Sequence, residues 1–241
     1  MVTTCASSAS TLARRVLTES EHARFKQDGF LTLPGLAPDH DLVAVRTTLA
    51  TLFENSGRTY GVIDHALDLA PQLKHSLVFQ ACERIAKELL GPTAAISFDQ
   101  ALYKPPHESI GTRWHQDQAF QGPHRPMNTV HFWIPLQSVN ELNGCLHFMR
   151  GSHLLGLLPH DQCSPNDPYA ITPRQLPPLE IVPCPLTLGD ATIHLPLTLH
   201  HALPNRTGSI RRAWALLFKP SSKLDALNPL PRLRQLFRTA A

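Results

Sequence analysis

Two histidines and one aspartate are spaced as metal ligands would be. His115 and Asp117 are separated by one residue, and on a β-strand such residues face the same side, so both could contact one ion. A third ligand could come from the distant pair His200 and His201, which would face opposite sides of a strand. Two imidazoles and one carboxylate on one face of an ion, with its other positions open, are typical of non-haem Fe(II) oxygenases. The chain has 14 histidines, so the His-x-Asp pair needs support from other residues.

An arginine downstream of the histidine pair adds a possible binding site for a carboxylate. Arg211 opens an apolar run that continues to Phe218 and is typical of a strand. The planar donors of a guanidinium can pair with both oxygens of a carboxylate, whereas Arg212 would face the opposite side of the strand. The sequence therefore offers a metal site with a cation nearby for an acidic co-substrate.

The sequence resembles the phytanoyl-CoA dioxygenase family of Fe(II)- and 2-oxoglutarate-dependent oxygenases. The segments that carry the resemblance follow the family's order: Trp114-His115-Gln116-Asp117, Asn143-Gly144-Cys145-Leu146, Arg150-Gly151-Ser152-His153, Gly189-Asp190, and His200 to Asn205 with Arg211. The resemblance implies that His115, Asp117 and His200 hold Fe(II). It selects His200 over His201, because the family's distal ligand lies five residues before the asparagine and 11 before the arginine.

The co-substrate site follows from the same resemblance. It implies that Arg211 binds the C5 carboxylate of 2-oxoglutarate and that Trp133 forms a wall of this site. Family members often carry a hydroxyl residue two positions after the distal ligand, where this chain has Ala202. Thr129 or Tyr103 could replace that hydroxyl beside Arg211.

Three further residues are candidates for substrate contact. Lys104 and Arg113 could place positive charge near the mouth of the site. His131 shares a strand face with Trp133, so it could contact the substrate or, alternatively, a metal ligand. The resemblance implies that O2 oxidises an unactivated C–H bond of a small molecule, with release of succinate and CO2. Related halogenases leave the carboxylate position of the iron to chloride, and Asp117 fills it here, so we expect hydroxylation. A secondary-metabolite or amino-acid-like substrate is the expectation.

Two other functions fit the same residues. A cupin-like metalloenzyme independent of 2-oxoglutarate could use the three ligands but would have no need of Arg211. A non-catalytic family member could bind a partner on the same fold, but it would have no need of the ligands.

The composition is that of a globular protein without a nucleic-acid partner. Of the 241 residues, 42% are hydrophobic and 17% are charged, and the formal net charge of +3 comes without a dense basic run. The five cysteines are scattered and form no Cys-x-x-Cys pair, so we expect reduced thiols. No signal peptide or membrane span is evident, which predicts a cytoplasmic protein. The sequence does not indicate the oligomeric state.

The order of elements predicts a mainly β fold with flanking helices (α+β), in one domain over 1–241. We expect a flexible arm at 1–16, an N-terminal helical layer at 17–92, a core at 93–220 and a C-terminal segment at 221–241 that ends in a surface helix. Helices are expected near 18–29, 38–57 and 71–90, and a long loop at 159–178. Short strands with turn signals are expected at 30–33, 96–103, 128–137, 145–149, 179–183, 191–195, 198–201 and 212–219. The resemblance implies that the core strands form a double-stranded β-helix (jelly roll, cupin-like).

Overall fold

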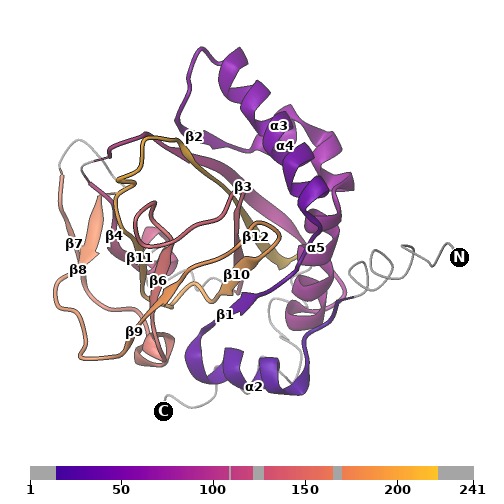
Figure 1. Ribbon diagram of the computed structural model, residues 1–241. Coiled ribbons are helices and arrows are strands. Elements are labelled where there is room, and N and C mark those ends of the chain that lie inside the picture. Colours follow the sequence, from indigo (N-terminus) through magenta and orange to yellow (C-terminus); the bar gives the residue numbers. More distant parts are fainter. Residues whose placement is uncertain (1–14, 109, 122–127, 165–169, 222–241) are drawn as a thin grey trace, which may run out of the picture.

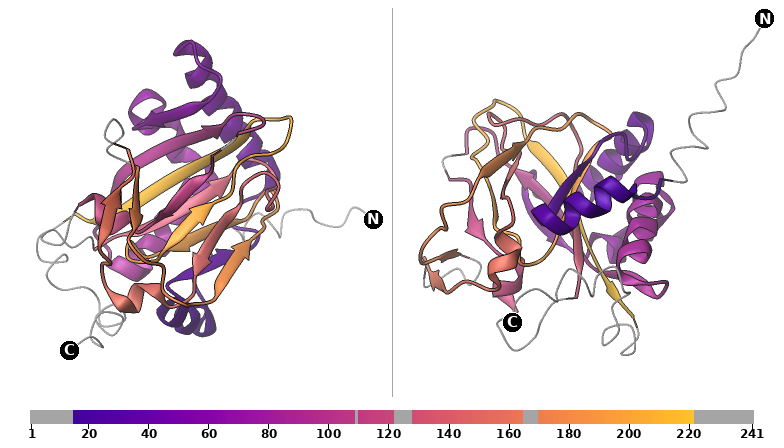
Figure 2. Two further views of the ribbon diagram at one scale, coloured as in Figure 1. Left: turned by 90° about the vertical axis from the view of Figure 1, so that its left-hand side faces the viewer. Right: turned by 90° about the horizontal axis from the view of Figure 1, so that it is seen from below.

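The computed structural model describes residues 15–108, 110–121, 128–164 and 170–221. Two sheets pack face to face, and helices from the first part of the chain cover the outer face of the larger sheet (Figure 1). Figure 2 shows these helices gathered on one side of the strands. The expected jelly-roll core with an N-terminal helical layer is confirmed. Within the described ranges, no helix is long and apolar enough to cross a membrane.

The chain crosses repeatedly between the two sheets. The larger sheet has the order β1 (Phe30–Leu33), β10 (Ala191–His194), β5 (Val130–Pro135), β12 (Arg211–Pro220), β3 (Ala94–Lys104) and β2 (Gly61–Asp64). The smaller sheet has the order β4 (Thr112–His115), β11 (His200–Ala202), β6 (Leu146–Met149) and β9 (Ile181–Cys184). A separate pair contains β7 (His160–Gln162) and β8 (Ile171–Pro173). From β3 to β6 and from β9 to β12 consecutive strands alternate between the two main sheets, which brings distant segments face to face.

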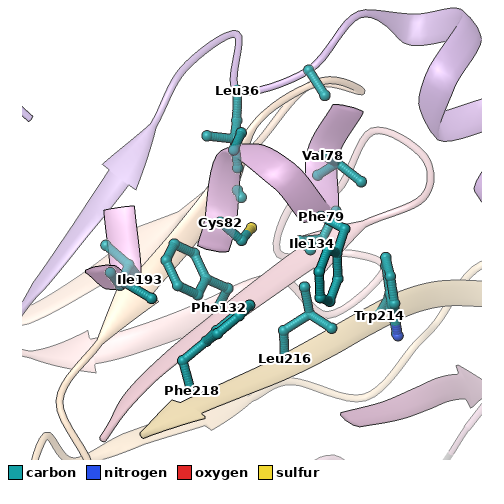
Figure 3. Close-up of a cluster of buried hydrophobic side chains, with 14 of the residues drawn as sticks. Leu36, Val78, Phe79, Cys82, Phe132, Ile134, Ile193, Trp214, Leu216 and Phe218 are labelled. Carbon is teal, nitrogen blue, oxygen red and sulfur yellow. The ribbon is translucent and has the colours of Figure 1, made fainter. Parts of the chain in front are cut away.

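The larger sheet is buried on both faces, and the alternation of its side chains gives the faces different roles. Residues of one face pack against the helix α5 (Leu77–Leu90) in the main hydrophobic cluster (Figure 3). This face includes Phe132, Ile134, Ile193, Trp214, Leu216 and Phe218. The other face, with Trp133 and Ala213, packs with Phe148 and Ala202 of the smaller sheet. Burial on both faces explains why β5 is apolar almost throughout.

Local sequence signals account for the helix boundaries. The helix α2 (Glu19–Asp28) begins with the expected capping box, in which Thr18 and Glu21 bond each other's backbone N–H groups, and it ends at Gly29 with φ of 83°. The remaining helices are α3 (Asp39–Asn55), α4 (Ala66–Leu69), η1 (Pro71–His75), α5, η2 (Asp117–Phe120) and η3 (Ser152–Leu155). Ser76 caps α5, and the Asp41 carboxylate accepts from the first two N–H groups of that helix. The three expected helical regions are therefore confirmed.

Some local predictions were wrong or lie outside the described residues. The expected loop at 159–178 contains β7 and β8, and the strands β2 and β4 were not predicted. These four strands are three or four residues long, which is too short to show an alternating pattern. Most of the predicted arm (1–14) and nearly all of the C-terminal segment (222–241) lie outside the described residues. The division of the chain into these segments stays a prediction.

Candidate active site

The three predicted metal ligands lie together between the two sheets. His115 ends β4 and His200 begins β11, and the two residues are partners across this antiparallel pair. Oδ1 of Asp117 lies 3.5 Å from Nε2 of His115 and 3.8 Å from Nε2 of His200. Ligand atoms bonded at about 2.1 Å to one metal ion are separated by roughly 3 Å. Small side-chain movements would therefore bring all three atoms to one ion.

A buried glutamine turns the chain between the first two ligands. Asp117 is the first residue of η2, whereas the His-x-Asp spacing alone would bring both ligands to one ion only if they shared a strand. The Gln116 side chain donates to the carbonyls of Gly156 (2.8 Å) and Leu197 (2.7 Å) and accepts from the N–H of Leu158 (2.8 Å). These three bonds fix the bend, so the ligands converge through a change of backbone direction and not through strand alternation.

Backbone carbonyls select the nitrogen that each imidazole presents. Nδ1 of His115 lies 2.8 Å from the carbonyl oxygen of Arg113, and Nδ1 of His200 lies 3.0 Å from that of Thr198. A carbonyl oxygen can only accept, so Nδ1 carries the proton in both rings and Nε2 is bare in the neutral form. Bare nitrogens next to a carboxylate suit Fe(II) or another divalent transition metal.

The protonation states of Asp117 and His200 also favour a metal ion. Burial raises the pKa of the Asp117 carboxyl, but the imidazoles of His131 and His200 and hydrogen bonds from neighbouring histidines bring it well below its ordinary value. Burial, with the neighbouring His115, lowers the pKa of His200 well below its ordinary value. Burial also acts to lower the pKa of His115, but the hydrogen bond and charge of Asp117 outweigh it and the pKa is raised. Asp117 is thus ionised and His200 neutral near neutral pH, the forms that bind a metal.

A buried cation lies at one end of the space between the sheets. Arg211 begins β12, only 2% of its surface is exposed, and its guanidinium lies over the Trp133 ring at 5.4 Å. Among the described residues, its Nε and Nη1 atoms have no hydrogen-bond partner. Burial lowers the pKa of Arg211 to about 10, against the opposite effects of Glu108 and Cys145, so the side chain is charged at neutral pH. Unsatisfied buried donors are costly, and the carboxylate of a bound 2-oxoglutarate would satisfy them.

Comparison with known proteins fits this geometry. The family model for phytanoyl-CoA dioxygenase (PhyH) matches residues 25–213, a range that contains the three ligands and Arg211. The chain belongs to the phytanoyl-CoA dioxygenase family. The expected class, an Fe(II)- and 2-oxoglutarate-dependent oxygenase, is confirmed at the level of this family.

Relatives and solved structures extend the likeness over most of the chain. The peroxisomal phytanoyl-CoA dioxygenase of Mus musculus is 26% identical over 240 residues, which cover 88% of this chain and 71% of the mouse protein. EvdO2 from Micromonospora carbonacea var. aurantiaca, solved with 2-oxoglutarate, has a TM-score of 0.77 and 27% identity and covers 90% of this chain and 96% of its own. The epimerase SnoN from nogalamycin biosynthesis, solved with Fe3+, α-ketoglutarate and nogalamycin RO, has a TM-score of 0.65, 23% identity and coverages of 91% and 90%.

Neither predicted replacement for the missing hydroxyl at Ala202 lies beside Arg211. Tyr103 packs on the helix side of the larger sheet, where it stacks on Phe53 and Arg212 lies over its ring. The error was one of strand register: Tyr103 is the partner of Arg212, so it shares that residue's face. Thr129 precedes β5 and lies four residues before Trp133, which is about 13 Å along an extended chain at about 3.3 Å per residue. Its hydroxyl bonds to His131.

The three candidate substrate residues have different positions. One ring nitrogen of His131 lies 2.6 Å from Asp117 and the other 2.9 Å from Thr129, which fits the expected contact with a metal ligand, the second of its two predicted roles. Lys104 is the strand partner of Arg211 and forms an ion pair of 2.9 Å with Glu108, so it lies at the co-substrate end and not at the mouth. Arg113 is exposed on β4 two residues before His115, a position compatible with substrate contact.

Four residues that the sequence interpretation missed belong to this region. Gln116 fixes the bend, and Glu108 links Lys104 to the loop at Asn205, whose N–H also donates to the Glu108 carboxylate at 3.2 Å. His194 bonds to Asp117 at 3.0 Å. Burial, together with the charge of His115, lowers the pKa of His160 of β7, and the buried Nε2 of His160 lacks a partner among the described residues. Their polar type was the available signal, but the pairing of distant strands could not be inferred from it.

Proposed function

We propose that this protein is a 2-oxoglutarate-dependent dioxygenase that oxidises an unactivated C–H bond of a small molecule. In this proposal His115, Asp117 and His200 hold Fe(II), and Arg211 anchors the C5 carboxylate of 2-oxoglutarate. The bound iron and 2-oxoglutarate supply the oxidising chemistry from O2, with release of succinate and CO2.

The observation that carries the proposal is the buried cation of Arg211, two of whose donors have no partner among the described residues. A metal site alone would fit many enzymes, but a fully buried guanidinium with free donors indicates an acidic ligand. Trp133 holds the guanidinium in place by its ring face. Lys104 and Glu108 lie at the same end and add one cation and one anion, so the three groups carry one net positive charge. A single carboxylate would neutralise it.

The chain's own residues position the reactants. The carbonyl oxygens of Arg113 and Thr198 accept from Nδ1 of His115 and His200, so that Nε2 of each ring is free to bind the metal. The bend at Gln116 directs the Asp117 carboxylate to the same point. Hydroxylation is the proposed outcome, because Asp117 leaves no ligand position for a halide beside 2-oxoglutarate and O2. Gln116 and His200 are buried, which limits the access of water to the reacting atoms.

A secondary metabolite is the proposed kind of substrate. EvdO2 and SnoN, the latter from nogalamycin biosynthesis, support a small molecule over a macromolecule. Arg113 would offer the substrate a cation, and Nε2 of His160, which lacks a partner within the described part of the chain, would offer a hydrogen-bonding group. The absence of a nucleic-acid partner and a cytoplasmic location stay predictions.

Anaerobic titration of the purified protein with Fe(II) and then 2-oxoglutarate tests the proposal. Chelation of iron by 2-oxoglutarate should produce a charge-transfer band in the visible region, as the family resemblance implies. A protein that binds Fe(II) but gives no band at any 2-oxoglutarate concentration would be the cupin-like metalloenzyme. A protein that binds neither would be a non-catalytic family member.

A further inference from the structure

Two imidazoles from adjacent strands hold the second oxygen of Asp117. His131 of β5 and His194 of β10 are partners in the antiparallel register. Both face the space between the sheets, because their neighbours Phe132 and Ile193 face the helices (Figure 3). Nδ1 of His131 lies 2.6 Å and Nε2 of His194 lies 3.0 Å from Oδ2 of Asp117. Sheet register thus brings two donors to one carboxylate oxygen, while Oδ1 faces His115 and His200.

His131 is fixed at both ends of its ring. An ionised carboxylate can only accept, so Nδ1 of His131 carries the proton that points to Asp117. The hydroxyl of Thr129 lies 2.9 Å from Nε2 and donates to it. A neutral ring therefore satisfies both nitrogens, and the chain Thr129 to His131 to Asp117 leaves the imidazole little freedom to turn.

His194 completes the pair from the neighbouring strand. Its Nε2 donates to Oδ2 of Asp117 for the same reason. Its Nδ1 is buried and has no hydrogen-bond partner among the described residues. A proton on that nitrogen would place a charged ring and an unpaired N–H in a buried site, so His194 is a neutral donor through Nε2.

The geometry points to His131 and His194 as positioning residues that hold Oδ2 of Asp117 and leave Oδ1 alone to bind the metal. This inference rests on the proposed function, because it takes His115, Asp117 and His200 as the metal ligands. An octahedral ion with three protein ligands has three positions left, which 2-oxoglutarate and O2 together fill. A carboxylate bound through both oxygens would occupy one of them. The two imidazoles engage the oxygen that would otherwise do so.

A second metal ion is the competing interpretation. Asp117, His131 and His194 have ligand atoms close enough to hold an ion of their own. The two ligand groups share one carboxylate, however, so two divalent ions would bring a large excess of positive charge into a buried site. The bond from Thr129 also fits a ring that donates from its other nitrogen. These observations favour hydrogen bonding over a second ion.

Variants that remove or keep each donor test the positioning role. His131→Leu and His194→Leu remove the donors, whereas His131→Asn and His194→Gln place an amide N–H near the original nitrogen. His147→Leu is the matched control, because this buried histidine bonds Cys145 and Glu141 and does not contact Asp117. Co(II) affinity and stoichiometry are measured anaerobically by calorimetry, and the visible spectrum of bound Co(II) reports its coordination. Thermal unfolding shows whether each variant is folded.

We expect one ion for each wild-type chain. Each leucine variant should lose about 10- to 100-fold in affinity, as replacement of residues behind metal ligands does, and should change the Co(II) spectrum. The amide variants should recover most of both, and the control should match the wild type. If a leucine variant does not fold, its amide counterpart and Thr129→Val, which frees the His131 ring, give the decisive comparison. A loss of affinity with an altered spectrum in Thr129→Val would support the role.

Three results would count against the inference. Wild-type affinity and spectrum in folded leucine variants, or in Thr129→Val where those do not fold, would remove the positioning role and leave the proposed function intact. Two ions in the wild type and one in the leucine variants would establish the second metal site instead. A wild-type chain that binds no Co(II) or Fe(II) would overturn the proposed function and the positioning role together.

Discussion

Replacing Arg211 by methionine should weaken 2-oxoglutarate binding strongly without destabilising the protein. Met retains an apolar stem of similar length, so the packing on Trp133 is largely kept, while the charge and its donors are lost. Removing one partner of a buried, hydrogen-bonded charge pair costs about 2–5 kcal/mol. At about 1.4 kcal/mol for each factor of ten in affinity, the lower end corresponds to about 30-fold. We therefore expect the Kd for 2-oxoglutarate to rise by about 30-fold or more.

The matched control for this variant is Arg212→Met. The Arg212 guanidinium lies over Tyr103 at 5.4 Å and donates to the carbonyl of Ile210, on the helix side of the same sheet. Its loss should leave the Kd for 2-oxoglutarate within about twofold, because Arg212 is the neighbour of Arg211 on the opposite face of the strand and does not face the space between the sheets. The Kd is read from the charge-transfer band in anaerobic titrations with saturating Fe(II).

Thermal unfolding gives an independent measure of the same substitution. Without 2-oxoglutarate, Arg211→Met should have an unfolding free energy equal to or above that of the wild type, since it removes a buried cation with unsatisfied donors. With 2-oxoglutarate at about 100 times its Kd, the wild type should gain about 2.7 kcal/mol, and most of this gain should vanish in the variant. Small and equal effects of Arg211→Met and Arg212→Met on both measurements would refute the carboxylate role of Arg211.

Further predictions follow from individual site residues. His200→Ala should abolish Fe(II) binding while His201→Ala keeps it, because the His201 ring lies 4.1 Å from Trp114 on the opposite face of β11; the reverse pattern would show that the strand was assigned one residue out of register. Turnover of the identified substrate in chloride buffer under heavy O2 should give a product with an added oxygen or two hydrogens fewer, whereas a chlorinated product would contradict the role of Asp117. Burial lowers the pKa of His153 below its ordinary value of 6.5, so the unfolded chain takes up this proton first as the pH falls. Denaturant titrations should show an unfolding free energy that falls below about pH 6.5 and depends less on pH in His153→Gln; an unchanged pH dependence in that variant would show that the proton uptake lies elsewhere.

The helices and most core strands were predicted well, because the signals for these elements lie within short stretches of sequence. The capping box at Thr18 and the aliphatic spacing of α3 fixed two helices, and the short apolar runs located most core strands. The spacing from His200 to Arg211 selected a histidine that faces Asp117. Each of these signals needs only a short stretch of chain or a family pattern to be interpreted.

Predictions failed where the answer depended on how distant strands pair. Tyr103 and Lys104 are neighbours in sequence, but only the register of β3 against β12 shows that Lys104 shares the face of Arg211. The contact between His194 and Asp117 joins residues 77 positions apart, and no local pattern indicates it. No role was predicted for Gln116, because its three hydrogen bonds go to loops whose positions no local pattern indicates.

Side chains alternate between the two faces of the sheet along β5 and β12, so even-numbered and odd-numbered residues offer separate targets for engineering. Even-numbered Phe132 and Trp214 pack on the helix side of the sheet, whereas odd-numbered His131, Trp133 and Arg211 face the space between the two sheets. A mutant library confined to even positions would vary thermal stability and leave the side chains of the active site unchanged. A library confined to odd positions would vary the active site and leave the hydrophobic core unchanged. Inserting or deleting one residue in either strand would exchange the two sets. New chemistry in this chain should therefore arise by substitution and not by a change of strand length.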